Sequence, residues 1–218
     1  MKLNLTELQF GSFLTYCPKS GGDEIENARN AMIYLKNDNY IQNPPILMSE
    51  LIAKTMAQRR SKLPFESLFK PNTILIPCPK SSLMQRDTLW VPQRIASALI
   101  SYGFGKETSQ CLIRKIPVRK SATSPPQLRP TAYEHYDSMI IQESLVNPTE
   151  IVLIDDIVTR GATLIGAANR IADLYPNASI KAFAAMRTMS NPSDFKKLID
   201  PCIGTIELVP DDGTFRRP

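Results

Sequence analysis

The stretch that decides the fold is Ile151–Thr163, which reads IVLIDDIVTRGAT. Four aliphatic residues come first, then two adjacent carboxylates, two more aliphatic residues, and a short loop with one glycine and two threonines. A short aliphatic run is typical of a strand that is buried on both faces of a parallel sheet. We therefore predict a strand over Ile151–Asp155, a loop over Thr159–Thr163, and a helix from Ala162 to about Leu174.

Other short apolar runs alternate along the chain with segments of helical periodicity. This alternation predicts an α/β fold with a doubly wound, mostly parallel sheet, and we assign residues 71–218 to this core. Residues 1–70 form a predicted accessory region of one strand and two helices, which together with the C-terminal tail serves as a hood. The accessory strand is Gln9–Cys17, the other strands of the sheet are Ile74–Pro77, Cys111–Arg114, Ile180–Ala185 and Thr205–Val209, and helices begin at Asp23, after Pro45 and near Pro92.

The composition is that of an ordinary soluble protein. The 218 residues are 43% hydrophobic and 22% charged, which allows a sizeable core. No apolar run approaches the roughly 18 residues of a membrane span, and the first residues lack the apolar core of a secretory signal. The four cysteines are far apart and His135 is the single histidine, so we expect reduced thiols and no metal site built by the protein. These features predict a cytoplasmic protein without membrane association, in which His135 is either a lone catalytic base or a surface or structural residue.

The net charge of +5 is concentrated in one segment. No acidic residue occurs between Glu107 and Glu134, and the rest of the chain is close to neutral. A nucleic-acid groove usually needs a broader basic face with aromatic residues for stacking, so we expect a small polyanion and regard nucleic acid as the weaker alternative. The five cations of the segment are Arg114, Lys115, Arg119, Lys120 and Arg129.

The loop after the central strand has the residues of an anion site. Ligands of open α/β sheets bind beyond the carboxyl ends of the strands, and this loop lies there. Gly161 permits a tight turn, the hydroxyls of Thr159 and Thr163 can donate, and the helix that starts at Ala162 offers unpaired N–H groups to an anion. Arg160 adds positive charge. No G-x-x-x-x-G-K-[ST] loop occurs in the chain, so the prediction is a phosphate monoester and not a nucleoside triphosphate bound by a Walker loop.

Asp155 and Asp156 stand directly before this loop, where bare carboxylates would repel the same anion. They suit the site if they accept hydrogen bonds from neutral hydroxyl groups of the same ligand, and the two ring hydroxyls of a ribose 5-phosphate meet that requirement. The alternative is that one aspartate caps the loop and the other coordinates a metal ion. A phospho-acceptor site is a poorer match, because its acidic pair is expected on a different strand from the acceptor.

The thirteen residues Ile151–Thr163 resemble the phosphoribosyl-pyrophosphate motif of the type I phosphoribosyltransferases. A second resemblance spans about Ile74–Leu174, where LIPCPKS, CLIRK and SPPQL follow one another in the order seen in the ComF-like phosphoribosyltransferases. That group has an arginine–glycine–aromatic stretch after its first strand, and QRDTLWVPQ keeps Arg86 and Trp90 but lacks the glycine. The zinc-binding cysteine module often found at that group's N-terminus is also missing from this sequence.

The resemblance implies roles for two further segments. The loop after the first sheet strand, Pro77–Ser81, corresponds to the loop that binds pyrophosphate in the family. In this loop Lys80 would be the cation and Ser81 a hydrogen-bond donor, and Cys78 and Pro79 complete the binding segment. Its alternative is a proline-stiffened connection with an exposed lysine. The basic segment is similar to the family's lid. The alternative is that this segment is a disordered surface loop. From this resemblance we place Arg119 with Asp155 and Asp156 in the catalytic set, and Arg86 in the substrate site.

The resemblance implies transfer of ribose 5-phosphate from phosphoribosyl pyrophosphate to a nitrogen nucleophile, with pyrophosphate released. Mg²⁺ would arrive bound to the pyrophosphate and take few protein ligands. The expected ligands are phosphoribosyl pyrophosphate or a nucleoside monophosphate. Two alternatives stay open, a non-catalytic protein that binds such ligands, and an interaction module for nucleic acid or protein that uses the basic loop. The sequence leaves the acceptor base and the oligomeric state open, with a homodimer as one possibility.

Overall fold

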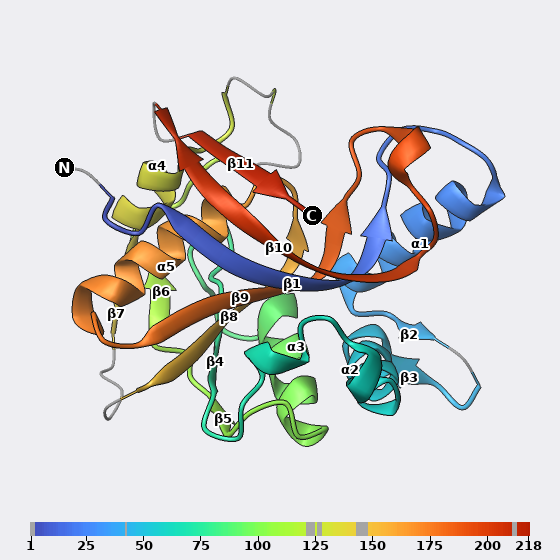
Figure 1. The fold of residues 1–218 in the computed structure, drawn as a ribbon, viewed down its shortest axis with the longest axis horizontal. Coiled ribbons are helices and arrows are strands. Elements are labelled where there is room, and N and C mark those ends of the chain that lie inside the picture. Colours follow the sequence, from blue (N-terminus) through green and yellow to red (C-terminus); the bar gives the residue numbers. More distant parts are fainter. Residues whose placement is uncertain (1–2, 42, 121–124, 126–127, 143–147, 211–212) are drawn as a thin grey trace.

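The fold is built on a mostly parallel sheet, as predicted. The computed structural model describes residues 3–41, 43–120, 125, 128–142, 148–210 and 213–218. Within them the main sheet has seven strands, of which β1, β9, β8, β4 and β5 are mutually parallel, while β10 and β11 pair antiparallel at one edge (Figure 1). The strand order is β11 (Gly213–Arg217), β10 (Ile199–Val209), β1 (Glu7–Tyr16), β9 (Ser179–Thr188), β8 (Glu150–Val158), β4 (Ile74–Pro77) and β5 (Glu107–Thr108).

The aliphatic run at the start of β8 is buried on both faces. Ile151 and Leu153 belong to one apolar cluster, and Val152 and Ile154 belong to another on the opposite face. Because successive strand residues point to opposite sides, each half of the run requires its own covering layer. All four side chains are almost fully buried, and each such burial stabilises the fold by about 1.5–3 kcal/mol.

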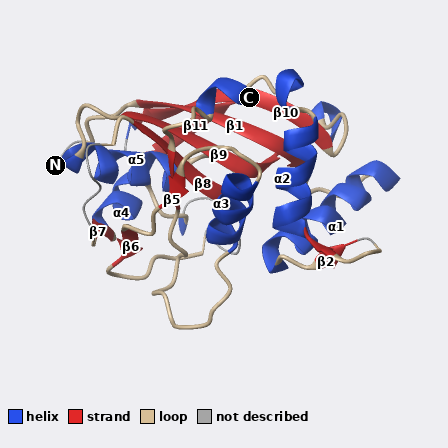
Figure 2. Ribbon diagram, turned by 90° about the horizontal axis from the view of Figure 1, so that it is seen from below, coloured by secondary structure: helices blue, strands red, loops and turns tan. Residues whose placement is uncertain are grey.

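Helices supply these two layers. One face of the sheet packs against α4 (Ala132–Asp137) and α5 (Ala162–Leu174), and the other against α2 (Met48–Gln58) and α3 (Val91–Ser101). Figure 2 shows α4 and α5 together at one end of the molecule, and α1 (Asp23–Asn37) beside α2 at the other. The helices predicted from Asp23, after Pro45, near Pro92 and from Ala162 are confirmed.

Two predictions about the middle of the chain were wrong. The segment Cys111–Arg114 was expected in the main sheet, but β6 (Leu112–Arg114) pairs with β7 (Met139–Ile141) in a separate two-stranded sheet. In this position Arg114 is 4% exposed, and its Nε–H donates to Lys80 O in the loop after β4. The stretch Lys115–Tyr136, with four prolines and no periodicity, was expected to be one long loop, but α4 starts within it at Ala132.

A local signal fixes the start of α4. The Thr131 side chain accepts from the backbone N–H of Glu134, and the Glu134 carboxylate accepts from the N–H of Thr131, which makes a capping box. This pattern of threonine followed three residues later by glutamate was present in the sequence. The short hairpin of β2 (Tyr40–Ile41) and β3 (Ile46–Leu47) was also not predicted.

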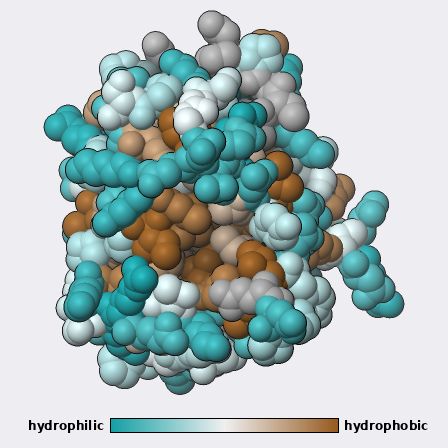
Figure 3. Space-filling model, turned by 90° about the vertical axis from the view of Figure 1, so that its right-hand side faces the viewer, coloured by the Kyte–Doolittle hydropathy of each residue, from teal (hydrophilic) through white to brown (hydrophobic). Residues whose placement is uncertain are grey.

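The first seventy residues contribute to the main sheet as well as to its surroundings. Strand β1 lies inside the sheet between β10 and β9, and it is close to the predicted Gln9–Cys17. The carboxyl ends of β1 and β9 point toward the side of the molecule where α1 lies (Figure 1). The space-filling view of that side shows an apolar hollow surrounded by hydrophilic residues (Figure 3). None of the helices in the described part of the chain is long and apolar enough to cross a bilayer.

Candidate functional site

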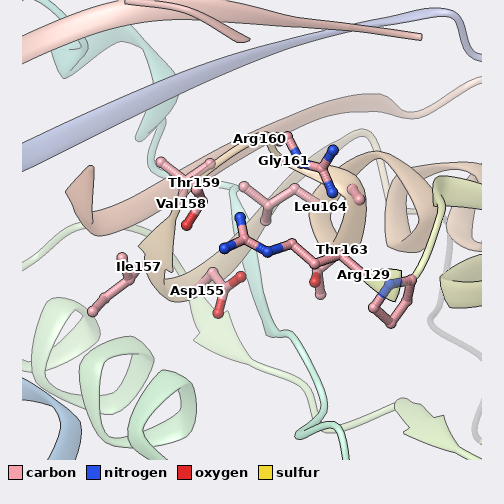
Figure 4. A pocket seen from close by; sticks show the side chains of 11 residues that line it. Arg129, Asp155, Ile157, Val158, Thr159, Arg160, Gly161, Thr163 and Leu164 are labelled. Carbon is pink, nitrogen blue, oxygen red and sulfur yellow. The ribbon is translucent and has the colours of Figure 1, made fainter. Parts of the chain in front are cut away.

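A pocket lies where β8 ends and α5 begins, at the carboxyl end of the parallel strands (Figure 4). It brings together the end of β8, the whole of the Thr159–Thr163 loop, and two residues that precede α4. Its lining residues are Arg129, Pro130, Asp155, Ile157, Val158, Thr159, Arg160, Gly161, Ala162, Thr163 and Leu164. The five loop residues predicted to bind phosphate therefore all line one pocket.

Gly161 has two structural reasons to be a glycine. Its φ of +89° lies in the left-handed region, which other residues rarely adopt. A Cβ atom at this position would stand 2.6 Å from Cδ1 of Ile206, so the loop packs directly on β10. The N-cap of α5 is Gly161, which has no side chain to cap the helix, and among the described residues the first backbone N–H groups are open to an anion.

The two aspartates of the motif face different sides of the sheet. Asp155 lines the pocket, whereas Asp156 points to α1, where its Oδ2 lies 2.7 Å from Nζ of Lys36. The strand continues to Val158, beyond the predicted end at Asp155, so the alternation of side chains holds through both residues. The structure brings Asp155 to the anion loop and does not bring Asp156 there.

The electrostatics of Asp155 favour the neutral form. Desolvation and the neighbouring charge of Asp156 raise the pKa of the Asp155 carboxyl well above its usual range, although the charge of Lys36 opposes the shift. In Figure 4 the guanidinium of Arg129 extends over the pocket toward Asp155. Arg129 was counted in sequence as one cation of the basic segment, and the fold places it beside the anion loop.

The predicted pyrophosphate loop, Pro77–Ser81, follows β4 and neighbours β8. Hydrogen bonds from distant segments hold its backbone: Cys78 N–H donates to Ile154 O at 2.8 Å, Trp90 Nε1–H donates to Cys78 O at 2.8 Å, and Arg114 Nε–H donates to Lys80 O at 2.6 Å. Pro77, Cys78 and Pro79 are buried, while Lys80 and Ser81 are half-buried. Burial raises the pKa of the Cys78 thiol, so it stays protonated.

The remaining predicted site residues are exposed. Arg86 lies in the connection between β4 and α3, and Arg119 in the basic segment. Neither lines the pocket. The basic segment contacts the predicted pyrophosphate loop, because Val118 N–H donates to Ser81 O at 2.8 Å. Residues 121–124 and 126–127 of the predicted lid lie outside the described residues.

Sequence reasoning missed a buried polar network behind the pocket. The guanidinium of Arg114 bonds to Lys80 O, to the Ser138 hydroxyl and to Nδ1 of His135, and Nε2 of His135 lies 3.3 Å from Oγ1 of Thr163. The sequence separates these residues by up to 83 positions, and only the docking of α4 on α5 brings them together. The presence of a single histidine was the sequence feature that could have pointed to this network.

A second missed residue is Arg216 of β11. Its Nε donates to Thr159 O at 2.7 Å, and its Nη2 donates to Thr188 O at 2.6 Å. The half-buried side chain thus joins the ends of β8 and β9 to the C-terminal strand.

No known protein-family model matches this chain, and no curated protein matches its sequence. Among solved structures, that of a hypoxanthine phosphoribosyltransferase from Staphylococcus aureus is similar, with a TM-score of 0.32 and 13% identity over 70% of this chain and 68% of that one. The chemistry of the pocket is therefore the basis on which function is assigned.

Proposed function

We propose that the protein binds phosphoribosyl pyrophosphate and transfers its ribose 5-phosphate to a nitrogen nucleophile, with release of pyrophosphate. One observation carries the proposal: a single pocket joins the Thr159–Thr163 loop at the N-terminus of α5 to the carboxylate of Asp155. An anion site and a hydroxyl acceptor a short distance apart suit a sugar phosphate better than a free phosphate.

The ligand's 5-phosphate accepts hydrogen bonds from the backbone N–H groups at the start of α5 and from loop hydroxyls. On binding, a ribose hydroxyl donates to Asp155 and lowers its pKa, because a hydrogen bond to the carboxylate favours the charged form. Such an interaction with a charged acceptor contributes about 1.5–3 kcal/mol. Because Lys36 already holds Asp156, we assign the ribose contact to Asp155 and a supporting role to Asp156.

The reaction forms a bond from the acceptor nitrogen to the ribose anomeric carbon and breaks the bond from that carbon to a pyrophosphate oxygen. The transition state has oxocarbenium character, and the negative charge grows on the leaving pyrophosphate. Lys80 of the loop after β4 and Arg119 of the basic segment are the cations we assign to that charge. We also assign Arg86 to the phosphates of the leaving pyrophosphate.

We assign to this pocket a Mg²⁺ ion that would enter with the ligand. In the described residues no group of three or more His, Cys, Asp or Glu side chains is arranged to hold a metal ion. Mg²⁺ in phosphate sites is commonly held by one or two carboxylates, substrate oxygens and water. Asp155 would supply the carboxylate, and the ion would supply positive charge to the pyrophosphate.

A non-catalytic binder of the same ligands is the second candidate. Two observations favour it: Asp156 is paired with Lys36, and Lys80 does not line the pocket in this structure. Such a protein would bind the sugar phosphate without positioning the leaving group.

Two measurements separate these candidates. Calorimetry with phosphoribosyl pyrophosphate and Mg²⁺ tests binding, with ribose 5-phosphate and inorganic phosphate for comparison. Pyrophosphate release in the presence of purine and pyrimidine bases tests transfer. Binding with release supports the transferase, binding without release supports the second candidate, and equal affinity for inorganic phosphate and ribose 5-phosphate contradicts both.

A further inference from the structure

A chain of buried and partly buried hydrogen bonds connects the two loops to which the proposed function assigns phosphates. It begins at the carbonyl oxygen of Lys80, which accepts from Arg114 Nε–H at 2.6 Å. Arg114 Nη2 lies 3.4 Å from His135 Nδ1, and His135 Nε2 lies 3.3 Å from Thr163 Oγ1, in the wall of the pocket. Arg114 is 4% and His135 3% exposed, so neither group exchanges its partners for water.

The partners of His135 determine which ring nitrogen carries its proton. A guanidinium has donors and no acceptor, so Nδ1 must accept from Arg114 and must be unprotonated. Burial and the charge of Arg114 lower the pKa of His135 to about 3, so the ring is neutral and its one proton is on Nε2. Nε2–H therefore donates to Oγ1 of Thr163.

This assignment determines the direction of the Thr163 hydroxyl. A hydroxyl that accepts from Nε2–H keeps its own hydrogen for another acceptor. Within the described residues, the Thr163 hydroxyl has His135 as its hydrogen-bond partner, and Thr163 lines the pocket. The hydroxyl hydrogen is thus available to an anion at the start of α5.

We propose that His135 is a positioning residue, which holds the Thr163 hydroxyl as a donor to the phosphate bound in the Thr159–Thr163 loop. Through Arg114 the same residue connects that loop to Lys80 in the loop assigned to pyrophosphate. The inference deepens the proposed function and depends on it for the identity of the anion. His135 does not touch the substrate, so its effect passes through Thr163.

The packing of α4 on α5 explains how His135 reaches its place. Gly166 lies in the middle of α5, and a Cβ there would stand 2.6 Å from Ala132 O and 2.8 Å from His135 Cβ. The missing side chain allows α4 to approach α5 closely, and the capping box at Thr131 fixes where α4 starts. A glycine in a helix interior otherwise costs about 1 kcal/mol relative to alanine.

The first test reads the tautomer directly. The chain has one histidine, so a sample with ¹⁵N-labelled histidine gives one pair of ring-nitrogen signals without assignment. We expect Nδ1 to resonate as an unprotonated nitrogen and Nε2 as a protonated one, with no change on titration through the ordinary histidine range near pH ~6.5. A proton on Nδ1, or titration in that range, would overturn the inference whatever ligand the pocket binds.

The second test uses two variants of the same size. In His135→Gln the amide oxygen can accept from Arg114 and the amide N–H can donate to Thr163, so we expect affinity for ribose 5-phosphate within about threefold of the parent. In His135→Glu the carboxylate only accepts, so Thr163 must donate to it and is lost to the ligand. We expect at least about tenfold weaker binding, the loss of one hydrogen bond to a charged group.

Two controls separate positioning from a general loosening of α4. Tyr136→Phe removes the 2.7 Å bond from the Tyr136 hydroxyl to Asp173 on α5 without touching the pocket, and should lower thermal stability without changing affinity. In a Thr163→Val background the difference between His135→Gln and His135→Glu should shrink to the part caused by the negative charge that glutamate adds. If the difference is as large there as in the parent background, or if His135→Glu binds like the parent, the inference is wrong. Absence of pyrophosphate release by the parent would refute the transferase while leaving these binding results to decide the role of His135.

Discussion

The Nζ atom of Lys36 on α1 lies 2.7 Å from Oδ2 of Asp156 on β8, across 120 positions of sequence. This pair fixes the end of α1 to the motif strand and gives the second aspartate a partner inside the protein. Its neighbour Asp155 faces the pocket on the other side of the sheet. Two adjacent carboxylates that are equivalent in sequence therefore have different partners in the fold.

The first prediction concerns this division. Asp155→Asn should weaken ribose 5-phosphate binding at least about tenfold, because an amide is a weaker acceptor for the ribose hydroxyl. Asp156→Asn should change it by less than about threefold, since its side chain faces Lys36. Calorimetry on both variants measures this. Binding of inorganic phosphate should be unchanged or tighter in Asp155→Asn, because a negative charge has been removed, and an equal loss for both ligands would show that Asp155 is structural.

A second prediction follows from the raised pKa of Asp155. The carboxyl keeps its proton to higher pH than an exposed aspartate, and the charge that repels an anion appears only as pH rises through that pKa. Sulfate keeps its charge as this carboxyl titrates, so its binding to the parent should weaken as pH increases through the raised pKa of Asp155. Asp155→Asn should lose most of this dependence. An unchanged pH profile in the variant would assign the effect to another group.

Most of the fold could be predicted because the local sequence indicates the secondary structure of β8, β9, β4 and α5. Aliphatic runs identify buried strands, and the glycine and threonines before Ala162 identify a strand–loop–helix unit. The place of β1 inside the sheet and of β6 outside it could not be predicted, because strand order depends on contacts between distant segments. The sequence assigned no role to Lys36 or Arg216, counted Arg114 as one cation of the basic segment, and left His135 as either a lone catalytic base or a surface or structural residue.

The third prediction is an acid dependence of stability. The pKa of His135 is about 3 in the folded protein and near 6.5 when exposed in the unfolded chain. Because the folded pKa is depressed, its contribution to stability is complete above about pH 6.5 and is lost as pH falls toward about 3, by at most about 1.4 kcal/mol per pH unit. Urea unfolding of the parent and of His135→Gln should show a free-energy difference that declines with acid over this window. A difference that is constant with pH would mean that His135 is not buried as the neutral ring.

The last prediction concerns Arg216, which connects the C-terminal strand to the anion loop. Its guanidinium donates to Thr159 O and Thr188 O, at the ends of β8 and β9. Arg216→Met would leave both carbonyl oxygens without this donor and release the start of the loop, so we expect inorganic phosphate and ribose 5-phosphate to bind several-fold more weakly by a similar factor. This pattern differs from Asp155→Asn, which should discriminate between the two ligands.

The neighbouring Arg217 provides the matched control for this prediction. It stands on the same strand, its side chain is 62% exposed, and it pairs with Glu207 on β10. An exposed ion pair of this kind contributes about 0–1 kcal/mol, so Arg217→Met should leave both affinities unchanged. Calorimetry of the two variants, with thermal unfolding to confirm that both remain folded, distinguishes the alternatives. If Arg216→Met and Arg217→Met bind phosphate equally well, β11 does not organise the loop, and its contact with Thr159 serves the sheet edge alone.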